Sequence, residues 1–138
     1  MSQRKLSRTG SPQDWLIHAK SDLSLARLAR SHKTVLPEQV CFHAQQAGEK
    51  ALKAVLLFKG LEFPLVHDIE VLLEVAKVGG LRLPRNVRQA GALSPYAVEA
   101  RYPGYDEDIT ASDIDEAIRL AESVVDWASE ILRAHRGA

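Results

Sequence analysis

The sequence predicts an all-α protein, folded as an antiparallel up-and-down bundle of four to five helices. Apolar residues recur at intervals of three and four over long stretches of the 138-residue chain. No useful stretch alternates apolar and polar residues as a half-buried strand does, and no glycine-rich phosphate loop, repeat or low-complexity tract occurs. We expect one domain over residues 11–138, preceded by a flexible basic leader over residues 1–10.

The longest uninterrupted helix-forming run extends from Pro37 to Gly60. Proline suits the first turn of a helix, because its missing N–H would have no partner there, and glycine suits the left-handed residue that ends one. At about 100° per residue, the run places a broad arc of mostly small side chains on one side. We expect a neighbouring helix to approach this arc closely, and we expect two copies of the chain to pair through it; the arc consists of Val40, Ala44, Ala47, Gly48, Ala51, Ala54, Val55 and Phe58.

Other helices are predicted on both sides of the central run. Ser11 is the expected cap of a helix over residues 12–31, and Asp68 caps a short one over residues 69–79. Pro95 interrupts any helix over residues 85–100, because proline lacks the N–H and crowds the preceding turn, so we expect a kink or two short helices there.

The last helix is predicted from its two ends. Thr110 or Ser112 caps it, acidic residues follow in its first turn, and basic residues fill its last turn near Arg136. This distribution complements the helix dipole at both ends.

Composition narrows the function classes. Eighteen basic side chains balance eighteen acidic ones, so no overall field favours non-specific binding to nucleic acid or anionic membrane. The single cysteine, Cys41, forms neither an internal disulfide nor a zinc site, and we expect neither a metal nor a cofactor. The basic leader lacks the apolar segment of a signal peptide, and no run has transmembrane length. We therefore expect a cytoplasmic protein without a membrane partner.

A polar patch on the central run is the most suggestive chemistry. His43, Gln46, Lys50 and Lys53 fall within roughly 80° of one another on the helical wheel. The alternative is that both lysines are solvated, with Glu49 pairing with Lys53 four positions on and His43 merely amphipathic.

Two further places offer candidate ligand contacts. His67 precedes a helix cap, where it either packs over the helix start or reaches a ligand near exposed amides. Arg101 and Tyr102 lie in a turn-forming sequence that sets a guanidinium among aromatic rings.

The central phrase CFHAQQAGEKALKAVL resembles the HEPN family (higher eukaryotes and prokaryotes nucleotide-binding domain). This resemblance implies an α-helical bundle, commonly dimeric, in a family named for nucleotide binding and often encoded beside a minimal nucleotidyltransferase. Several branches are instead RNA-cleaving toxins. Three other motifs stand in the family's order around this phrase. Trp15, Ala19 and Asp22-Leu23 precede it, and His67-Asp68 and Arg101-Tyr102-Pro103 come after it.

Three functional hypotheses follow. The first is a non-catalytic nucleotide-binding or adaptor module, a homodimer working with a minimal nucleotidyltransferase, because lysine and arginine suit phosphate, tyrosine stacks on a base and glutamine reads a base edge. It has no catalytic residue, and its candidate nucleotide contacts are His43, Gln46, Lys50, His67, Arg101 and Tyr102.

The second hypothesis is a metal-independent RNase of a toxin–antitoxin pair, and the third is a dimerising scaffold without a ligand. RNase branches carry an arginine followed by histidine after four to six intervening residues, near the final helices. Here the one formal match, Arg27 with His32, lies at the end of the first helix; His43 with a basic partner is the other candidate. The sequence thus leaves enzyme status open and favours the non-catalytic module.

Overall fold

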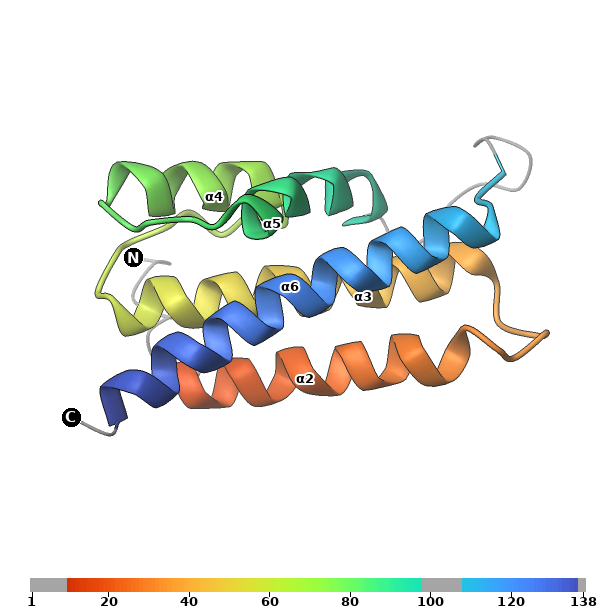
Figure 1. Ribbon diagram of the computed structural model, residues 1–138, viewed down its shortest axis with the longest axis horizontal. Helices are drawn as coiled ribbons and strands as arrows, with labels where there is room; N and C mark the ends of the chain where they lie inside the picture. Colours follow the sequence, from red (N-terminus) through yellow and green to blue (C-terminus); the bar gives the residue numbers. More distant parts are fainter. Residues whose placement is uncertain (1–9, 98–107, 137–138) are drawn as a thin grey trace.

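The computed structural model describes residues 10–97 and 108–136, with side chains up to residue 134. Within these residues all regular structure is helical, which confirms the expected all-α bundle (Figure 1). None of these helices is long and apolar enough to cross a membrane. The elements are α2 (Pro12–Ala29), α3 (Pro37–Phe58), α4 (Ile69–Val78), α5 (Arg85–Arg88), the 3-10 helix η1 (Gln89–Ala97) and α6 (Ala111–Arg136).

Two helices begin with reciprocal capping, as their sequences predict. The Ser11 hydroxyl accepts from the Asp14 N–H, and the Ser11 N–H donates to the Asp14 carboxylate. Thr110 and Asp113 exchange the same two bonds, so Thr110 rather than Ser112 caps α6. Each pair satisfies amides that have no partner inside the helix, which fixes where α2 and α6 start.

The other ends also follow local signals. The Asp68 carboxylate accepts from the Glu70 N–H at the start of α4. Gly60 follows α3 with φ of 72°, a conformation that side chains with a Cβ rarely adopt. The expected break near Pro95 appears as two short elements, α5 and η1, with the proline inside the 3-10 turn.

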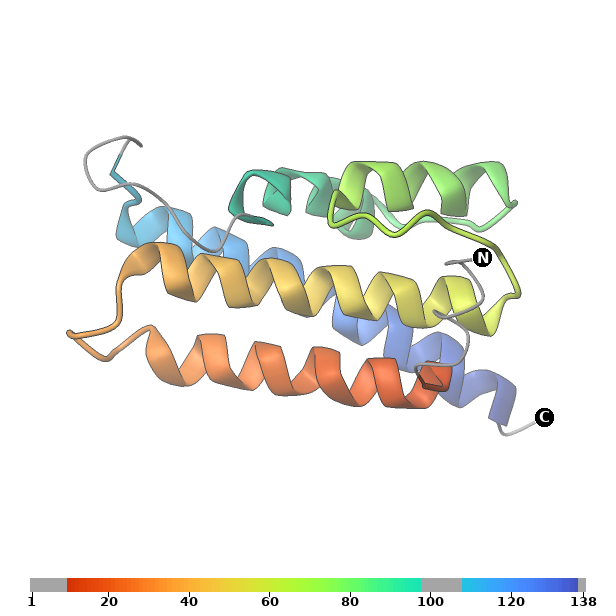
Figure 2. The same ribbon diagram turned by 180° about the vertical axis from the view of Figure 1, so that it is seen from behind.

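Helix α3 lies at the centre of the bundle. It packs against α2, α6, α4 and η1. The colours show α3, α4 and α6 running in one direction and α2 and the α5–η1 segment in the other (Figures 1 and 2). Alternation is therefore interrupted between α3 and α4, because residues 59–68 run back along the bundle, and ten extended residues can span about 30 Å.

The small arc of α3 is enclosed by the rest of the same chain. Ala44, Ala47, Ala51 and Ala54 have no exposed surface. A Cβ placed on Gly48 would lie 3.1 Å from a methyl group of Leu93 and 3.4 Å from one of Ile69, so neighbouring side chains occupy the space beside it. The arc therefore supports close packing, as expected, but within one protomer. Any pairing of two copies needs a different surface.

Candidate ligand site on helix α3

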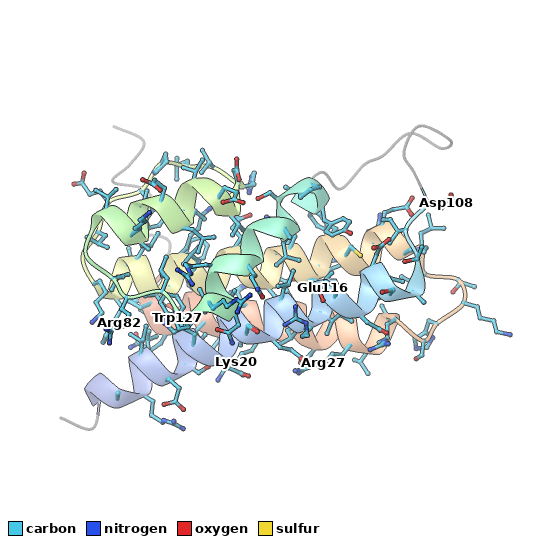
Figure 3. All side chains as sticks on the ribbon, turned by 45° about the horizontal axis from the view of Figure 1, so that its top comes forward. Lys20, Arg27, Arg82, Asp108, Glu116 and Trp127 are labelled. Carbon is cyan, nitrogen blue, oxygen red and sulfur yellow. The ribbon has the colours of Figure 1, made fainter. Side chains whose placement is uncertain are left out.

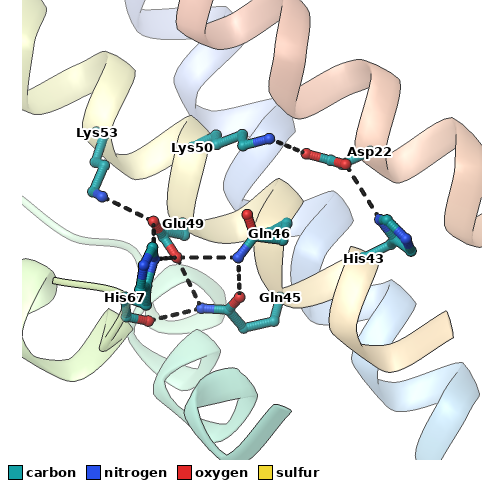
Figure 4. Close-up of polar contacts among 8 residues, drawn as sticks. All are labelled: Asp22, His43, Gln45, Gln46, Glu49, Lys50, Lys53 and His67. Atoms are coloured by element: carbon teal, nitrogen blue, oxygen red, sulfur yellow. Dashed lines mark hydrogen bonds and ion pairs between the residues drawn. The ribbon is translucent and has the colours of Figure 1, made fainter. Parts of the chain in front are cut away.

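Two carboxylates organise the polar patch, and the first is Asp22 of α2. Lys50 Nζ donates to Asp22 Oδ2 at 2.7 Å, and His43 Nδ1 lies 3.4 Å from Asp22 Oδ1. All three side chains are partly buried between α2 and α3. The Lys50 ammonium is therefore paired with a carboxylate of a neighbouring helix (Figure 4), and the Lys50 side chain is 26% exposed.

The second carboxylate is Glu49, which is almost fully buried. It receives hydrogen bonds from Lys53 Nζ at 2.8 Å and Gln45 Nε2 at 3.2 Å, and His67 Nδ1 lies 3.0 Å away. Gln46 Nε2 is 3.4 Å from Glu49 Oε1 and donates to Gln45 Oε1 at 2.9 Å. This convergence of donors replaces the water that a carboxylate loses on burial.

Lys53 is buried together with its partner. The Lys53 and Glu49 side chains are only 5% and 3% exposed. The ammonium also lies 5.7 Å from the ring centroid of Trp15 and 6.0 Å from that of Phe63, within cation–π range. Glu49 and the aromatic faces stabilise a charge that would be costly to bury alone.

These contacts correct the view that both lysines are solvated. The expected Glu49–Lys53 pair forms, but it is buried, and Lys50 pairs with Asp22 across a helix contact. Four of the candidate contacts lie on or beside one side of α3 and retain solvent exposure (Figure 4). These are His43, Gln46, Lys50 and His67. The other two, Arg101 and Tyr102, fall outside the described residues.

The helical wheel missed two acceptors of this network, Asp22 and Gln45, and the burial of the third, Glu49. A usable signal was present, because Phe42, Leu56 and Leu57 place apolar side chains at both ends of the polar side of α3, which indicates that other elements cover part of that side. Gln45, Glu49 and Lys53 repeat at intervals of four between those ends. A buried polar row of this kind predicts internal partners.

Each of the four candidate side chains that retain solvent exposure bonds to the protein through one polar atom or N–H and has another without a partner among the described residues. His43 and His67 contact carboxylates through Nδ1, and Lys50 uses one of its three N–H donors on Asp22. In the described part of the chain nothing donates to the Gln46 Oε1. The histidine Nε2 atoms, two Lys50 N–H groups and the Gln46 carbonyl oxygen can therefore meet a ligand without reorganising the side chains.

Metal binding has no support among the described side chains, where no group of three or more histidine, cysteine, aspartate or glutamate residues is placed to hold an ion. Lys50 and Lys53 each donate to one oxygen of a site carboxylate. The site is thus suited to hydrogen bonding and charge pairing.

Comparison with known proteins decides the family. The model of the HEPN domain matches residues 12–132. The chain belongs to the HEPN family. Its fold is similar to the crystal structure of ST0689, an archaeal HEPN homologue, at 30% identity and a TM-score of 0.70, over 88% of this chain and 97% of that chain. It is also similar to the crystal structure of TT1696 from Thermus thermophilus, at 28% identity and a TM-score of 0.69, over 86% and 96% of the two chains. No curated protein matches.

The HEPN phrase on α3 is thus the segment that carries the buried network. Within it, Gln45, Gln46, Glu49 and Lys53 are bonded to one another or to His67, so the phrase describes a set of interlocking contacts. The preceding motif supplies Asp22, which holds Lys50. The family motifs on three separate segments therefore meet at one place in the fold.

Proposed function

We propose that this HEPN protein is a nucleotide-binding or adaptor module that forms a homodimer and works with a minimal nucleotidyltransferase. The single observation that carries the proposal is the set of four pre-oriented, partly exposed polar groups beside α3. Lys50 and the imidazoles suit phosphate oxygens, and the Gln46 carbonyl suits the amino edge of a base. Arg101 and Tyr102 complete the proposed contacts through family resemblance.

The RNase alternative receives less support from the geometry. Arg27, the arginine of the one formal Arg–His match, donates from Nε and Nη2 to Glu122 of α6 at 2.9 and 2.7 Å. Both bonds hold the guanidinium against α6, and among the described residues Arg27 makes no hydrogen bond with His32, the histidine of the match. We therefore assign Arg27 a structural role in joining α2 to α6.

Removing the Lys50 charge should weaken nucleotide binding, whereas removing the Asp22 charge should strengthen it. Lys50→Ala removes two phosphate donors and should weaken binding about tenfold, or about 1.4 kcal/mol. Asp22→Asn leaves Lys50 in place but removes the charge that neutralises it, so phosphate should bind more tightly. The same weakening is expected for Arg101→Ala. Titration calorimetry with adenosine and guanosine nucleotides measures each affinity.

The control for these titrations is Lys59→Ala, since Lys59 is exposed at the end of α3 and outside the site. It should bind as the parent does. A parent chain that binds no nucleotide would favour the scaffold hypothesis, and equal affinities for the parent, Lys50→Ala and Asp22→Asn would remove the site assignment.

Dimer formation is expected to double the mass in solution. Light scattering at micromolar concentration should give about twice the 15.3 kDa of one chain. A mass of one chain across that range would contradict the homodimer. The partner is tested separately, by asking whether a minimal nucleotidyltransferase encoded beside this chain co-elutes with it.

A further inference from the structure

The outer face of α2 carries large apolar side chains that nothing in the described chain covers. Ile17, Leu25 and Leu28 are 63%, 45% and 67% exposed. Ile17 and Leu28 point in nearly the same direction, about 20° apart at 100° per residue. They also point away from the buried stripe of α2, which contains Leu16, Ala19, Leu23 and Ala26.

This face has the residue spacing that self-pairing requires. Ile17, Ser21, Ser24 and Leu28 follow one another at intervals of four, three and four, the spacing of a helix–helix seam. If a second α2 lies antiparallel on the same face, Ile17 of each copy meets Leu28 of the other, and Ser21 meets Ser24. Large residues then close both ends, and the small serines let the helices approach at the centre.

We propose that two copies of this chain associate through an antiparallel α2–α2 contact centred between Ser21 and Ser24. The inference rests on the homodimer in the proposed function and specifies its surface. The contact is isologous, as a twofold dimer requires, because the same residues serve on both sides. Leu25 of each copy lies on the same side of the seam as His18 of the other, whose exposed ring can cover part of the third exposed apolar side chain.

The charges at the ends of α2 complement each other in this orientation. Asp14 lies in the first turn, whereas His32 and Lys33 follow the last turn, next to Arg30, which pairs with Asp115 of α6. His32 and Lys33 are exposed and have no carboxylate partner within the described residues. An antiparallel partner brings this basic end beside the acidic start of the other α2, whereas a parallel partner would place like charges together.

A groove beside Ile17 provides room for a side chain of the partner. It lies between α2 and the C-terminal half of α6, has a volume of about 330 Å³, and is lined by Leu16, Ile17, Lys20 and Leu132, with Gln13, Ser129 and Arg133 at its other edges. Lys20 and Arg27 mark the edge of α2 that faces α6 (Figure 3). Leu28 of the second copy falls next to this groove. A stable interface buries about 1,200–2,000 Å² in total, so contact with α6 must extend the helix pair.

The decisive experiment places opposite charges on the two residues that meet across the twofold axis. Ile17→Lys and Leu28→Glu should each lower the mass in light scattering from two chains to one. The combined variant Ile17→Lys/Leu28→Glu should recover a dimer, because each lysine then faces a glutamate of the other copy. Within one chain the two positions are about 16 Å apart along the helix axis, so they cannot pair with each other.

The matched control is Ile17→Lys/Leu28→Lys, which changes the same positions but sets like charges against each other. It should remain monomeric, as the recovery depends on opposite charge. Val78→Glu alters an apolar position on α4 that is even more exposed, and it should leave the dimer intact. Both altered positions on α2 are exposed, so the helical circular dichroism of every variant should match the parent.

The outcomes separate this inference from the proposed function. If the parent is dimeric and both single variants stay dimeric, the α2 surface is wrong and the homodimer stands. If the two double variants dissociate alike, the antiparallel register is wrong. A monomeric parent would overturn both the homodimer and this surface, while the nucleotide titrations would still judge the ligand site.

Oxidative cross-linking gives an independent check of the register. Chains carrying Ser21→Cys and chains carrying Ser24→Cys, mixed in equal amounts, should form a disulfide-linked dimer in higher yield than either alone. The native Cys41 is buried and should not react. Equal yields from the mixture and from the separate variants would contradict the pairing of Ser21 with Ser24.

Discussion

Replacing Lys53 with alanine is expected to lower the free energy of unfolding by about 3–5 kcal/mol, the cost of leaving a buried charge without its partner. Glu49 keeps its hydrogen bonds from Gln45 and its contact with His67, but it loses the one ammonium that compensates it in the interior. The fall should be large because both side chains are almost fully enclosed. Urea unfolding followed by circular dichroism measures it.

Two controls show whether the effect arises from the unpaired charge. Lys59→Ala removes an exposed lysine from the end of the same helix and should change stability by less than about 0.5 kcal/mol. Glu49→Met/Lys53→Met removes both charges and should recover most of the loss, since apolar replacement of a whole buried pair is often neutral. A double variant as unstable as Lys53→Ala would indicate lost packing as the cause.

Gln45→Leu should cost about 2–3 kcal/mol, because it keeps the side chain's bulk but leaves buried polar groups without partners. The Gln45 amide donates to Glu49 and to the backbone carbonyl of His67, the latter at 2.8 Å, and it accepts from Gln46. Gln46→Leu is the matched control one position along. Among the described residues Gln46 makes only one short bond, to Gln45 Oε1, and Glu49 keeps its other donors, so the cost should be about 1 kcal/mol. Similar unfolding midpoints for the two variants would contradict the importance of the buried amide.

Local sequence signals predicted the helices well, because each depends on residues a few positions apart. The caps at Ser11, Asp68 and Thr110, the left-handed Gly60 and the break near Pro95 all need only the immediate chain. The small arc of α3 is buried, as its period predicted, but the burial extends further, to Gln45, Glu49 and Lys53. These features determine where each helix begins and ends and which of its sides faces the core.

The partners of the polar side chains could not be predicted in the same way. A wheel gives the direction of Lys50 on its own helix, but it cannot show that Asp22 stands opposite, because that depends on how α2 packs. The small arc of α3 has the same limitation, because its small side chains allow close packing with a helix of the same chain or of a second copy. The structure shows that this chain's own helices cover it, so the expected route to a dimer was wrong in its surface.

The position of α6 has a consequence for the protein during its synthesis. Helices α2 and α3 are adjacent in sequence and can pair as soon as both emerge, whereas α6 contacts both of them from the far end of the chain. The pairs Arg27–Glu122 and Arg30–Asp115, which link α2 to α6, must wait for that end. At ribosomal rates the delay is on the order of ten seconds. During that interval the α6-facing side of the α2–α3 hairpin is bare, and it is the surface that a nascent-chain chaperone would meet.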